Sequence, residues 1–258
     1  MISLWLFRVD EVLDGAGDIE PALRQLLAAE DREKLAGYRD RRARLHYFAG
    51  RALLRHALSQ TAEVEPHAWR LRYGEHGKPE LAPPFDRTRL FFSISHCGGL
   101  VVCAVAMGRK VGVDVEWLGR RVDEGGIARR FFSPQEVRDI EERSGIERAR
   151  RFFALWTLRE AYVKARGEGL SYPLERLACD LSGAAPQLAD CSLRDTEPGW
   201  YFSLSEPFAD YCVALCAEQG HGERNREPLI GSQMVTLDIS EAPRLSASDA
   251  AYFPWKFL

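Results

Sequence analysis

Long apolar runs, paired cysteine motifs and a surplus of positive charge are all missing from this sequence of 258 residues. No stretch approaches the 18 or more apolar residues of a membrane-spanning helix, so we expect neither a membrane segment nor a membrane partner. The 35 basic and 38 acidic residues leave a formal charge of −3, which provides no global basic field for nucleic acid. Hydrophobic residues make up 46% of the chain, a share typical of globular proteins.

Cysteine usage points to a reducing compartment. The six cysteines form no C-x-x-C pair, which argues against a zinc site. Four of them lie in apolar runs typical of buried strands, where a thiol packs as a small hydrophobe. The first ten residues are apolar but too short, and lack the basic region, for a secretory signal. We therefore expect thiols without disulfides in a soluble, cytoplasmic protein.

The order of predicted elements indicates two similar halves. Periodicity predicts helices over residues 21–36 and 38–58, and strands at 90–96, 100–107 and 111–117. The segment Phe91-Phe92-Ser93-Ile94-Ser95 recurs 110 positions later as Tyr201-Phe202-Ser203-Leu204-Ser205. Cys103-Ala104-Val105-Ala106 corresponds at the same offset to Val213-Ala214-Leu215-Cys216. The helix around Phe48 and Arg51 has a counterpart around Trp156 and Arg159.

This repeat predicts an α+β fold built as a pseudo-twofold pair of subdomains, each with a small antiparallel sheet and a long helix. The expected boundaries are residues 1–118 and 119–218, followed by a C-terminal extension over 219–258. Chance similarity between amphipathic strands is the alternative. The sequence does not decide the role of the extension.

Two carboxylates stand out on the predicted strand at 111–117. Valines alternate there with other residues, so Asp114 and Glu116 share one face of the strand. Like charges side by side are unfavourable unless a cation lies between them, and Mg²⁺ prefers carboxylate oxygens. The pattern fits either a solvated strand face or a magnesium site.

A second pair of charges lies on the predicted helix at 152–164. Glu160 and Lys164 are four positions apart, on the same side as Trp156. In an exposed helix they form an ordinary surface ion pair. The segment is apolar around most of its circumference, however, and a buried Glu and Lys need partners. A metal ion on Asp114 and Glu116, with a bound phosphate, would supply them.

Two loops offer groups that suit phosphate. The strand at 90–96 ends in Ser95 and His96 before two glycines, which let a ligand approach the backbone closely. The same histidine fits a simple strand cap. The turn Gly77-Lys78-Pro79 presents a cation, although lysine is common in turns.

In combination, five motifs in order resemble the surfactin-type 4′-phosphopantetheinyl transferase family, from about residue 30 to about residue 180. Each motif is weak alone, but their order is specific. They are Gly77-Lys78-Pro79, Phe92-Ser93-Ile94-Ser95-His96, Val111-Gly112-Val113-Asp114-Val115-Glu116, Phe131-Phe132-Ser133-Pro134-Gln135-Glu136 and Trp156-Thr157-Leu158-Arg159-Glu160-Ala161-Tyr162-Val163-Lys164. Beyond about residue 216 no family motif matches, which leaves the tail's role in doubt.

The resemblance implies a holo-[acyl-carrier-protein] synthase that transfers 4′-phosphopantetheine from coenzyme A to a serine of apo acyl or peptidyl carrier proteins, releasing 3′,5′-ADP. It implies that Asp114, Glu116 and Glu160 ligate Mg²⁺, in a cleft between the subdomains. Lys164 would stabilise developing charge, and Glu160 would be the candidate base that accepts the serine proton, directly or through a metal-bound water. The expected coenzyme A contacts are Ser95 and His96 at its phosphates and Lys78 and Pro79 at its nucleotide.

A local excess of positive charge suits the same ligand. Residues 32–55 contain eight Lys or Arg against two acidic residues, a local charge of +6. The 3′-phosphate of coenzyme A needs a cation, and the resemblance makes Arg42 and Arg51 the candidates, with the other arginines of 39–55 still open. Charge left over suits the acidic carrier proteins. The sequence does not say which carriers are preferred.

Two other functions fit the same residues. A Mg²⁺-dependent nuclease or nucleotidyl transferase also uses clustered carboxylates and a lysine. The acidic net charge disfavours it, and we expect no nucleic-acid partner. A non-catalytic module that binds acidic helical proteins is the other alternative. Because the internal duplication lets one chain build a whole site, we expect a monomer.

Overall fold

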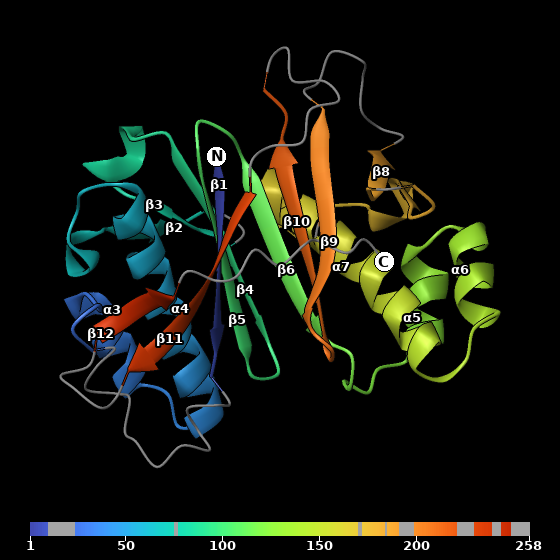
Figure 1. The fold of residues 1–258 in the computed structure, drawn as a ribbon, viewed down its shortest axis with the longest axis horizontal. Coiled ribbons are helices and arrows are strands. Elements are labelled where there is room, and N and C mark those ends of the chain that lie inside the picture. The colour runs from blue at the N-terminus through green and yellow to red at the C-terminus, as the bar shows by residue number, and fades with distance from the viewer. Residues whose placement is uncertain are drawn as a thin grey trace. The chain divides into compact units, whose positions relative to one another are not determined.

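A computed structural model describes residues 1–9, 24–74, 77–169, 172–183, 185–190, 199–220, 230–238 and 244–248. These residues form an α+β fold with two compact units (Figure 1). The first unit extends to Gly108 and includes the strands β11 (Ile230–Asp238) and β12 (Arg244–Ser248). The second unit begins at Arg109. The predicted α+β class, with two units, is confirmed.

The first unit contains a five-stranded sheet in the order β12-β11-β1-β5-β4. The other three strands are β1 (Ile2–Arg8), β4 (Leu90–Cys97) and β5 (Leu100–Met107). β5 lies between β1 and β4 and is almost entirely buried, as its continuous apolar run predicts. The sheet differs from the purely antiparallel one expected, because β11 pairs with β1 in parallel. Two strands from the C-terminal extension thus add to the first unit.

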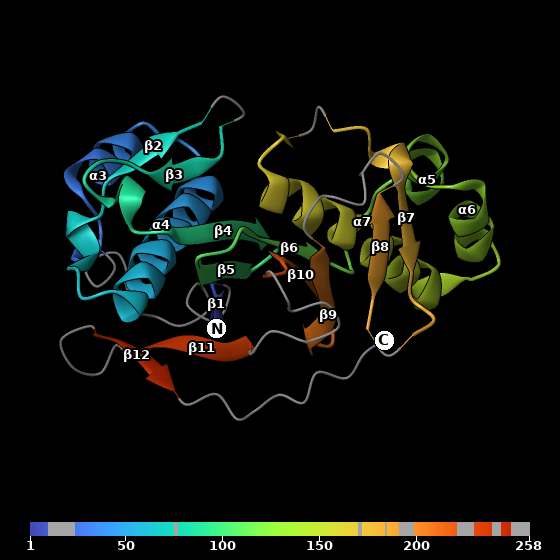
Figure 2. The same ribbon diagram turned by 90° about the horizontal axis from the view of Figure 1, so that it is seen from above.

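One face of this sheet is covered by α4 (Arg41–Thr61), beside α3 (Ala29–Ala36), as Figure 2 shows. Asp40 caps the start of α4, since its side chain accepts a hydrogen bond from the Ala43 amide at 2.7 Å. α3 begins later than the predicted helix, of which residues 21–23 lie outside the described residues. The helix α4 packs on alternate strand residues, which include Trp5, Phe7, Val101, Cys103, Val105 and Phe92.

Short elements complete the first unit. The hairpin of β2 (Leu71–Tyr73) and β3 (Pro79–Leu81) pairs Tyr73 with Pro79. The 3₁₀ turns η1 (Pro66–Ala68) and η2 (Phe85–Arg87) flank it. The turn within the hairpin includes Gly77, at φ +75°.

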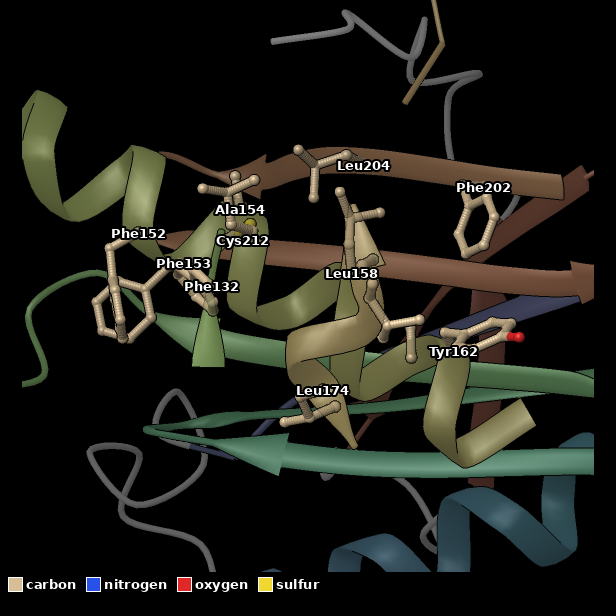
Figure 3. Close-up of a cluster of buried hydrophobic side chains, with 14 of the residues drawn as sticks. Phe132, Phe152, Phe153, Ala154, Leu158, Tyr162, Leu174, Phe202, Leu204 and Cys212 are labelled. Atoms are coloured by element: carbon tan, nitrogen blue, oxygen red, sulfur yellow. The ribbon is translucent and has the colours of Figure 1, made fainter. Parts of the chain in front are cut away.

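The second unit has a three-stranded antiparallel sheet in the order β6-β10-β9, covered by the long helix α7 (Gly145–Arg166). Its strands are β6 (Val111–Trp117), β9 (Trp200–Phe208) and β10 (Tyr211–Glu218). Figure 3 shows the core between helix and sheet, with Leu158 and Tyr162 of α7 near Leu204 and Phe202 of β9. The rings of Tyr162 and Phe202 lie 6.1 Å apart.

Two further helices and a hairpin pack on α7. The helices are α5 (Glu124–Phe131) and α6 (Pro134–Glu141), and η4 (Leu174–Arg176) leads into the hairpin of β7 (Leu177–Asp180) and β8 (Gln187–Asp190). Ser133 and Glu136 form a capping box that starts α6. Glu136 then reaches Arg159 of α7, which lies at 2.7 Å and is fully buried. The pair locks α6 onto α7.

The packing faces define how the two units correspond. Phe92 faces α4 and Phe202 faces α7, in agreement with the predicted offset of 110 for β4 and β9. Cys103 faces α4, but Ala214 rather than Val213 faces α7, so the predicted offset for β5 and β10 is wrong by one residue. A one-residue shift in the alignment exchanges the two faces of a strand. The correct correspondence is therefore seen only from which residues pack against the helix.

The boundary between the units differs from the predicted one at residue 118. The structure places it after Gly108, because β6 pairs with β10 and packs under α7. None of the five cysteines in the described residues is in a disulfide; Cys191 lies outside them. No helix in this part of the chain is both long and apolar enough to cross a membrane.

Candidate functional site

The strand β6 presents two distinct faces, as its alternation predicts. Gly112, Asp114 and Glu116 lie on the face toward α7, since a side chain added at Gly112 would meet that helix. The two carboxylates are nearly buried, with exposures of 5% and 6%. They therefore do not form a solvated strand face.

Gly112 sets how closely the helix approaches the strand. A Cβ atom at this position would lie 1.9 Å from the carbonyl oxygen of Ala161 and 2.4 Å from the amide nitrogen of Ala165. Both atoms belong to the backbone of α7 and cannot rotate away. Only glycine lets α7 pass over β6 at this distance, which brings the helix residues 160 and 164 to the two carboxylates.

Lys164 bonds across to the strand and not simply along its own helix. Its Nζ atom donates a hydrogen bond to Asp114 Oδ1 at 2.6 Å. The lysine side chain is 29% exposed and the aspartate 7%, so the pair is partly shielded from water. The structure thus brings Asp114 of the strand and Lys164 of the helix into direct contact.

Glu160 occupies the same neighbourhood. Burial raises the pKa of the Glu160 carboxyl, and the charges of Asp114 and Glu116 raise it further. The charge of Lys164 lowers it, and the net result is a pKa of about 7. The two strand carboxylates are therefore near enough to repel it. Three acidic groups from β6 and α7 share one partly buried region within the second unit.

This set of oxygens has the chemistry of a hard-cation site. Three carboxylates that repel one another gain most from a divalent ion, and Mg²⁺ prefers such ligands. As they stand, no three acidic, His or Cys side chains in the described part of the chain are arranged to hold an ion. Cations of the protein occupy the carboxylates: Lys164 is on Asp114, and Arg120 is on Glu116 at 2.9 Å.

The corresponding positions of the first unit carry no such charges. Trp5 of β1 faces α4 as Asp114 faces α7, and Trp5 contacts His56 of α4 with ring centroids 5.2 Å apart. His56 corresponds to Lys164 at the predicted helix offset of 108. An aromatic contact thus stands where the second unit has an ion pair, and the acidic set belongs to one unit alone.

The first unit brings together several predicted residues at the end of β4. The rings of His96 and His46 lie 5.2 Å apart. Arg42 donates to the Gly98 carbonyl at 3.5 Å, in the turn that follows β4. Burial and then the Arg42 charge lower the pKa of His46 below its usual value. Arg42, His96 and the adjacent Ser95 therefore gather around one turn.

A second cluster joins Arg51 to the β2–β3 hairpin. Arg51 donates to the Tyr73 hydroxyl at 2.5 Å, and its guanidinium lies 3.7 Å from Asp31. Lys34 lies over the Tyr73 ring, 4.7 Å from its centroid. Because Tyr73 pairs with Pro79, this cluster adjoins the Lys78–Pro79 turn. Arg42 and Arg51 thus belong to two different clusters.

Sequence reasoning missed Lys34, Tyr73 and Arg120. Lys34 lies in the basic stretch, but its position over an aromatic ring depends on a hairpin nearly 40 residues away. Arg120 is four residues after Glu116, a spacing that marks an ion pair in a helix but carries no such signal after a strand.

Comparison with known proteins gives these clusters a family context. Residues 110–216 match the 4′-phosphopantetheinyl transferase superfamily, and residues 19–108 match the family described as 4′-phosphopantetheinyl transferase, N-terminal. The 4′-phosphopantetheinyl transferase HetI of Nostoc sp. is 32% identical over 229 residues, 86% of this chain and 89% of the relative. The 4′-phosphopantetheinyl transferase Sfp of Bacillus subtilis is 29% identical over 191 residues, 74% and 82% of the two chains.

Among solved structures, the holo-[acyl-carrier-protein] synthase of Thermotoga maritima is 23% identical, with a TM-score of 0.35 over 53% of this chain and 81% of that chain. The two family matches follow one another along the chain, and the similarity to HetI extends over most of both proteins. The chain therefore belongs to the 4′-phosphopantetheinyl transferase superfamily and is an enzyme of the Sfp type.

Proposed function

We propose that this enzyme transfers the 4′-phosphopantetheine group of coenzyme A to a serine hydroxyl of an apo carrier protein in a Mg²⁺-dependent reaction. The observation that carries the proposal is the meeting of Asp114 and Glu116 with Glu160 and Lys164, in a chain of this family. Such a group suits phosphoryl transfer, which depends on positioning and on stabilising charge.

The reaction balances as one substitution at phosphorus. The serine oxygen forms a bond to the phosphorus that carries the pantetheine arm. The bond from that phosphorus to the bridging oxygen of the pyrophosphate breaks, and 3′,5′-ADP leaves with the bridging oxygen. The serine proton passes to Glu160. The products are the holo carrier and 3′,5′-ADP.

Asp114, Glu116 and Glu160 would hold the Mg²⁺ ion. When bound, the ion supplies neutralisation of charge on the pyrophosphate oxygens. Lys164, already hydrogen-bonded to Asp114, would offer its ammonium to the charge that develops on the transferring group. The proximity of Glu160 to both strand carboxylates supports its place in the set.

Coenzyme A would contact the first unit through the two clusters described above. Ser95, His96 and Arg42 would meet its phosphates at the turn after β4, which the contacts of Arg42 and His96 support. Lys78 and Pro79 would border the nucleotide. Arg51 would take the 3′-phosphate together with Lys34, since both cations contact Tyr73 beside that hairpin.

The carrier partners would be apo acyl and peptidyl carrier proteins, and the enzyme would act as a monomer. The exposed basic residues Arg32, Arg39 and Arg41 support a partner of acidic character.

The test is mass spectrometry of apo acyl and peptidyl carriers after incubation with coenzyme A and Mg²⁺. We expect a gain equal to one phosphopantetheine group, dependent on Mg²⁺ and abolished by alanine at the acceptor serine of the carrier. Asp114→Asn in the enzyme should abolish the gain without loss of folding by circular dichroism. No gain on any carrier, or full turnover with excess chelator, would refute the proposal.

A further inference from the structure

Arg120 holds one of the three carboxylates in an unusual way for a surface cation. Its Nη1 atom donates to both oxygens of Glu116, at 3.0 and 2.9 Å. A single nitrogen that contacts both oxygens lies between them, where a cation binding the carboxylate through both oxygens would lie. The Glu116 side chain is 8% exposed and that of Arg120 is 52% exposed. The cation therefore covers the open side of a nearly buried acid.

The backbone that carries Arg120 is fixed to the end of β6. The amide of Arg120 donates to the Trp117 carbonyl at 3.0 Å, and the amide of Leu118 donates to the Asp210 carbonyl at 2.8 Å. The Trp117 indole nitrogen also donates to Asp210, at 3.2 Å. These bonds hold the turn that carries Arg120 against the end of β6. From this position the Arg120 side chain reaches Glu116 on the strand.

The charges of the site show what the contact does. When all three are ionised, the carboxylates of Asp114, Glu116 and Glu160 carry three negative charges, and Lys164 and Arg120 supply two positive charges beside them. Lys164 lies on the more shielded side and Arg120 on the more exposed side. An incoming divalent ion therefore exchanges with Arg120 more easily than with Lys164, because the guanidinium can move into water.

We propose that Arg120 competes with the divalent cation for the Glu116 carboxylate and so sets the cation affinity of the site. The inference rests on the proposed function, in that it takes these carboxylates as the cation ligands. A competitor lowers the observed affinity, since binding of the ion must first displace it. Removal of Arg120 therefore tightens cation binding, the opposite of what loss of a residue that only orients Glu116 would do.

The experiment measures Mn²⁺ binding to the full-length, chelator-treated protein by electron paramagnetic resonance, without coenzyme A or carrier. We expect Arg120→Gln to tighten Mn²⁺ binding by about 3- to 10-fold, the range of an ion pair of about 1 kcal/mol. The matched control is Arg121→Gln, which removes the same charge from the next, exposed residue and should change the affinity less than about 2-fold.

A double-mutant cycle isolates the contact with Glu116. Glu116→Gln should weaken Mn²⁺ binding, and in that background Arg120→Gln should tighten it no more than Arg121→Gln does. An Arg120→Gln affinity equal to that of the control, or weaker than wild type, overturns the inference alone. If wild type binds no Mn²⁺, or Glu116→Gln leaves binding unchanged, the cation site of the proposed function is wrong and the inference falls with it.

Discussion

Glu160 carries a charge that the folded protein disfavours. Burial and the nearby charges of Asp114 and Glu116 raise its pKa to about 7, against about 4.5 in an unfolded chain. A raised pKa in an acid means that the folded state binds the proton more tightly. Without metal, stability is therefore lost as pH rises from about 4.5 through 7, and the full penalty is present above that window.

Glu160→Gln should consequently make the metal-free protein more stable while it abolishes transfer. At pH 8 in the presence of chelator, we expect the free energy of unfolding to rise by about 3 kcal/mol, because the pKa difference of about 2.5 units is worth roughly 1.4 kcal/mol per unit. Urea denaturation at pH 5 and pH 8 measures this, with the exposed Glu175→Gln as control. If the variant instead lost both stability and transfer activity, Glu160 would be a structural residue.

Arg42 and Arg51 lie in separate clusters, so they should differ in which phosphate of coenzyme A they affect. Arg51→Ala should weaken coenzyme A about 10-fold, but dephospho-coenzyme A less than 2-fold, because it loses a charge-assisted bond to the 3′-phosphate. Arg42→Ala, beside Gly98 and near His96, should weaken both ligands alike.

Isothermal titration of each variant with the two ligands measures this difference, and the exposed Arg87→Ala serves as the charge control. If Arg51→Ala affects both ligands equally, the 3′-phosphate does not bind beside Tyr73. If Arg42→Ala weakens coenzyme A but not dephospho-coenzyme A, then the 3′-phosphate binds at the cluster of Arg42 and not at that of Arg51.

At the scale of elements, the spacing of α7 over β6 depends on one missing side chain. Gly112→Ala places a methyl group 1.9 Å from the Ala161 carbonyl oxygen, so the helix must move away. We expect a loss of about 2–3 kcal/mol in stability and a weaker Mn²⁺ affinity, because Glu160 recedes from the strand. Thermal melting and Mn²⁺ titration check both effects.

Gly37→Ala is a suitable control for this substitution. Gly37 has an ordinary helical φ of −81°. A Cβ atom added there would lie 3.4 Å from its nearest neighbour, the Lys34 carbonyl oxygen. It should change stability by less than about 1 kcal/mol. A Gly112→Ala protein with wild-type melting and metal affinity would show that the close approach does not position the acidic set.

The junction of α6 and α7 depends on a buried ion pair. Burial alone would raise the pKa of Glu136, but the Arg159 charge and the hydrogen bonds from Arg159, Ser133 and Cys179 lower it overall. The stability that this pair adds is thus present above the unfolded pKa of about 4.5 and is lost as pH falls through the lower folded value.

Glu136→Gln should cost about 3–5 kcal/mol at pH 7, because Arg159 stays buried without its counter-ion. The difference from wild type should shrink as pH falls below 4. The exposed pair of Glu141 and Arg129, at 3.1 Å, supplies the control, since Glu141→Gln should cost less than about 1 kcal/mol at either pH. Denaturant unfolding at several pH values measures this. If the ion pair were unimportant, the free energies of unfolding of Glu136→Gln and wild type would differ by the same amount at every pH.

For the whole molecule, the sequence predicted best where a pattern repeats within one element. The alternation in β6 placed Asp114 and Glu116 on one face, and the four-residue spacing in α7 placed Glu160 and Lys164 on one side. Contacts between distant segments could not be predicted from the sequence in this way. The parallel pairing of β11 with β1 and the position of Lys34 over Tyr73 join residues with no shared pattern.

The two units share an architecture, but only the second carries the acidic set in the described residues. Both units pack a long helix on a three-stranded antiparallel core, but Trp5 and His56 fill the first where Asp114 and Lys164 fill the second. The sequence repeat predicted the shared architecture. It did not predict the difference in chemistry, because the repeat found in the sequence included no counterpart of β6, the strand that carries Asp114 and Glu116.

The proposed function requires that Asp114, Glu116 and Glu160 bind one divalent ion. A crystal structure of the enzyme soaked with Mn²⁺ and coenzyme A tests it most directly, through the anomalous signal of manganese. We expect one peak within about 2.0–2.4 Å of an oxygen from each of the three carboxylates. A manganese ion bound elsewhere, or one that leaves Glu160 outside its coordination sphere, would contradict it.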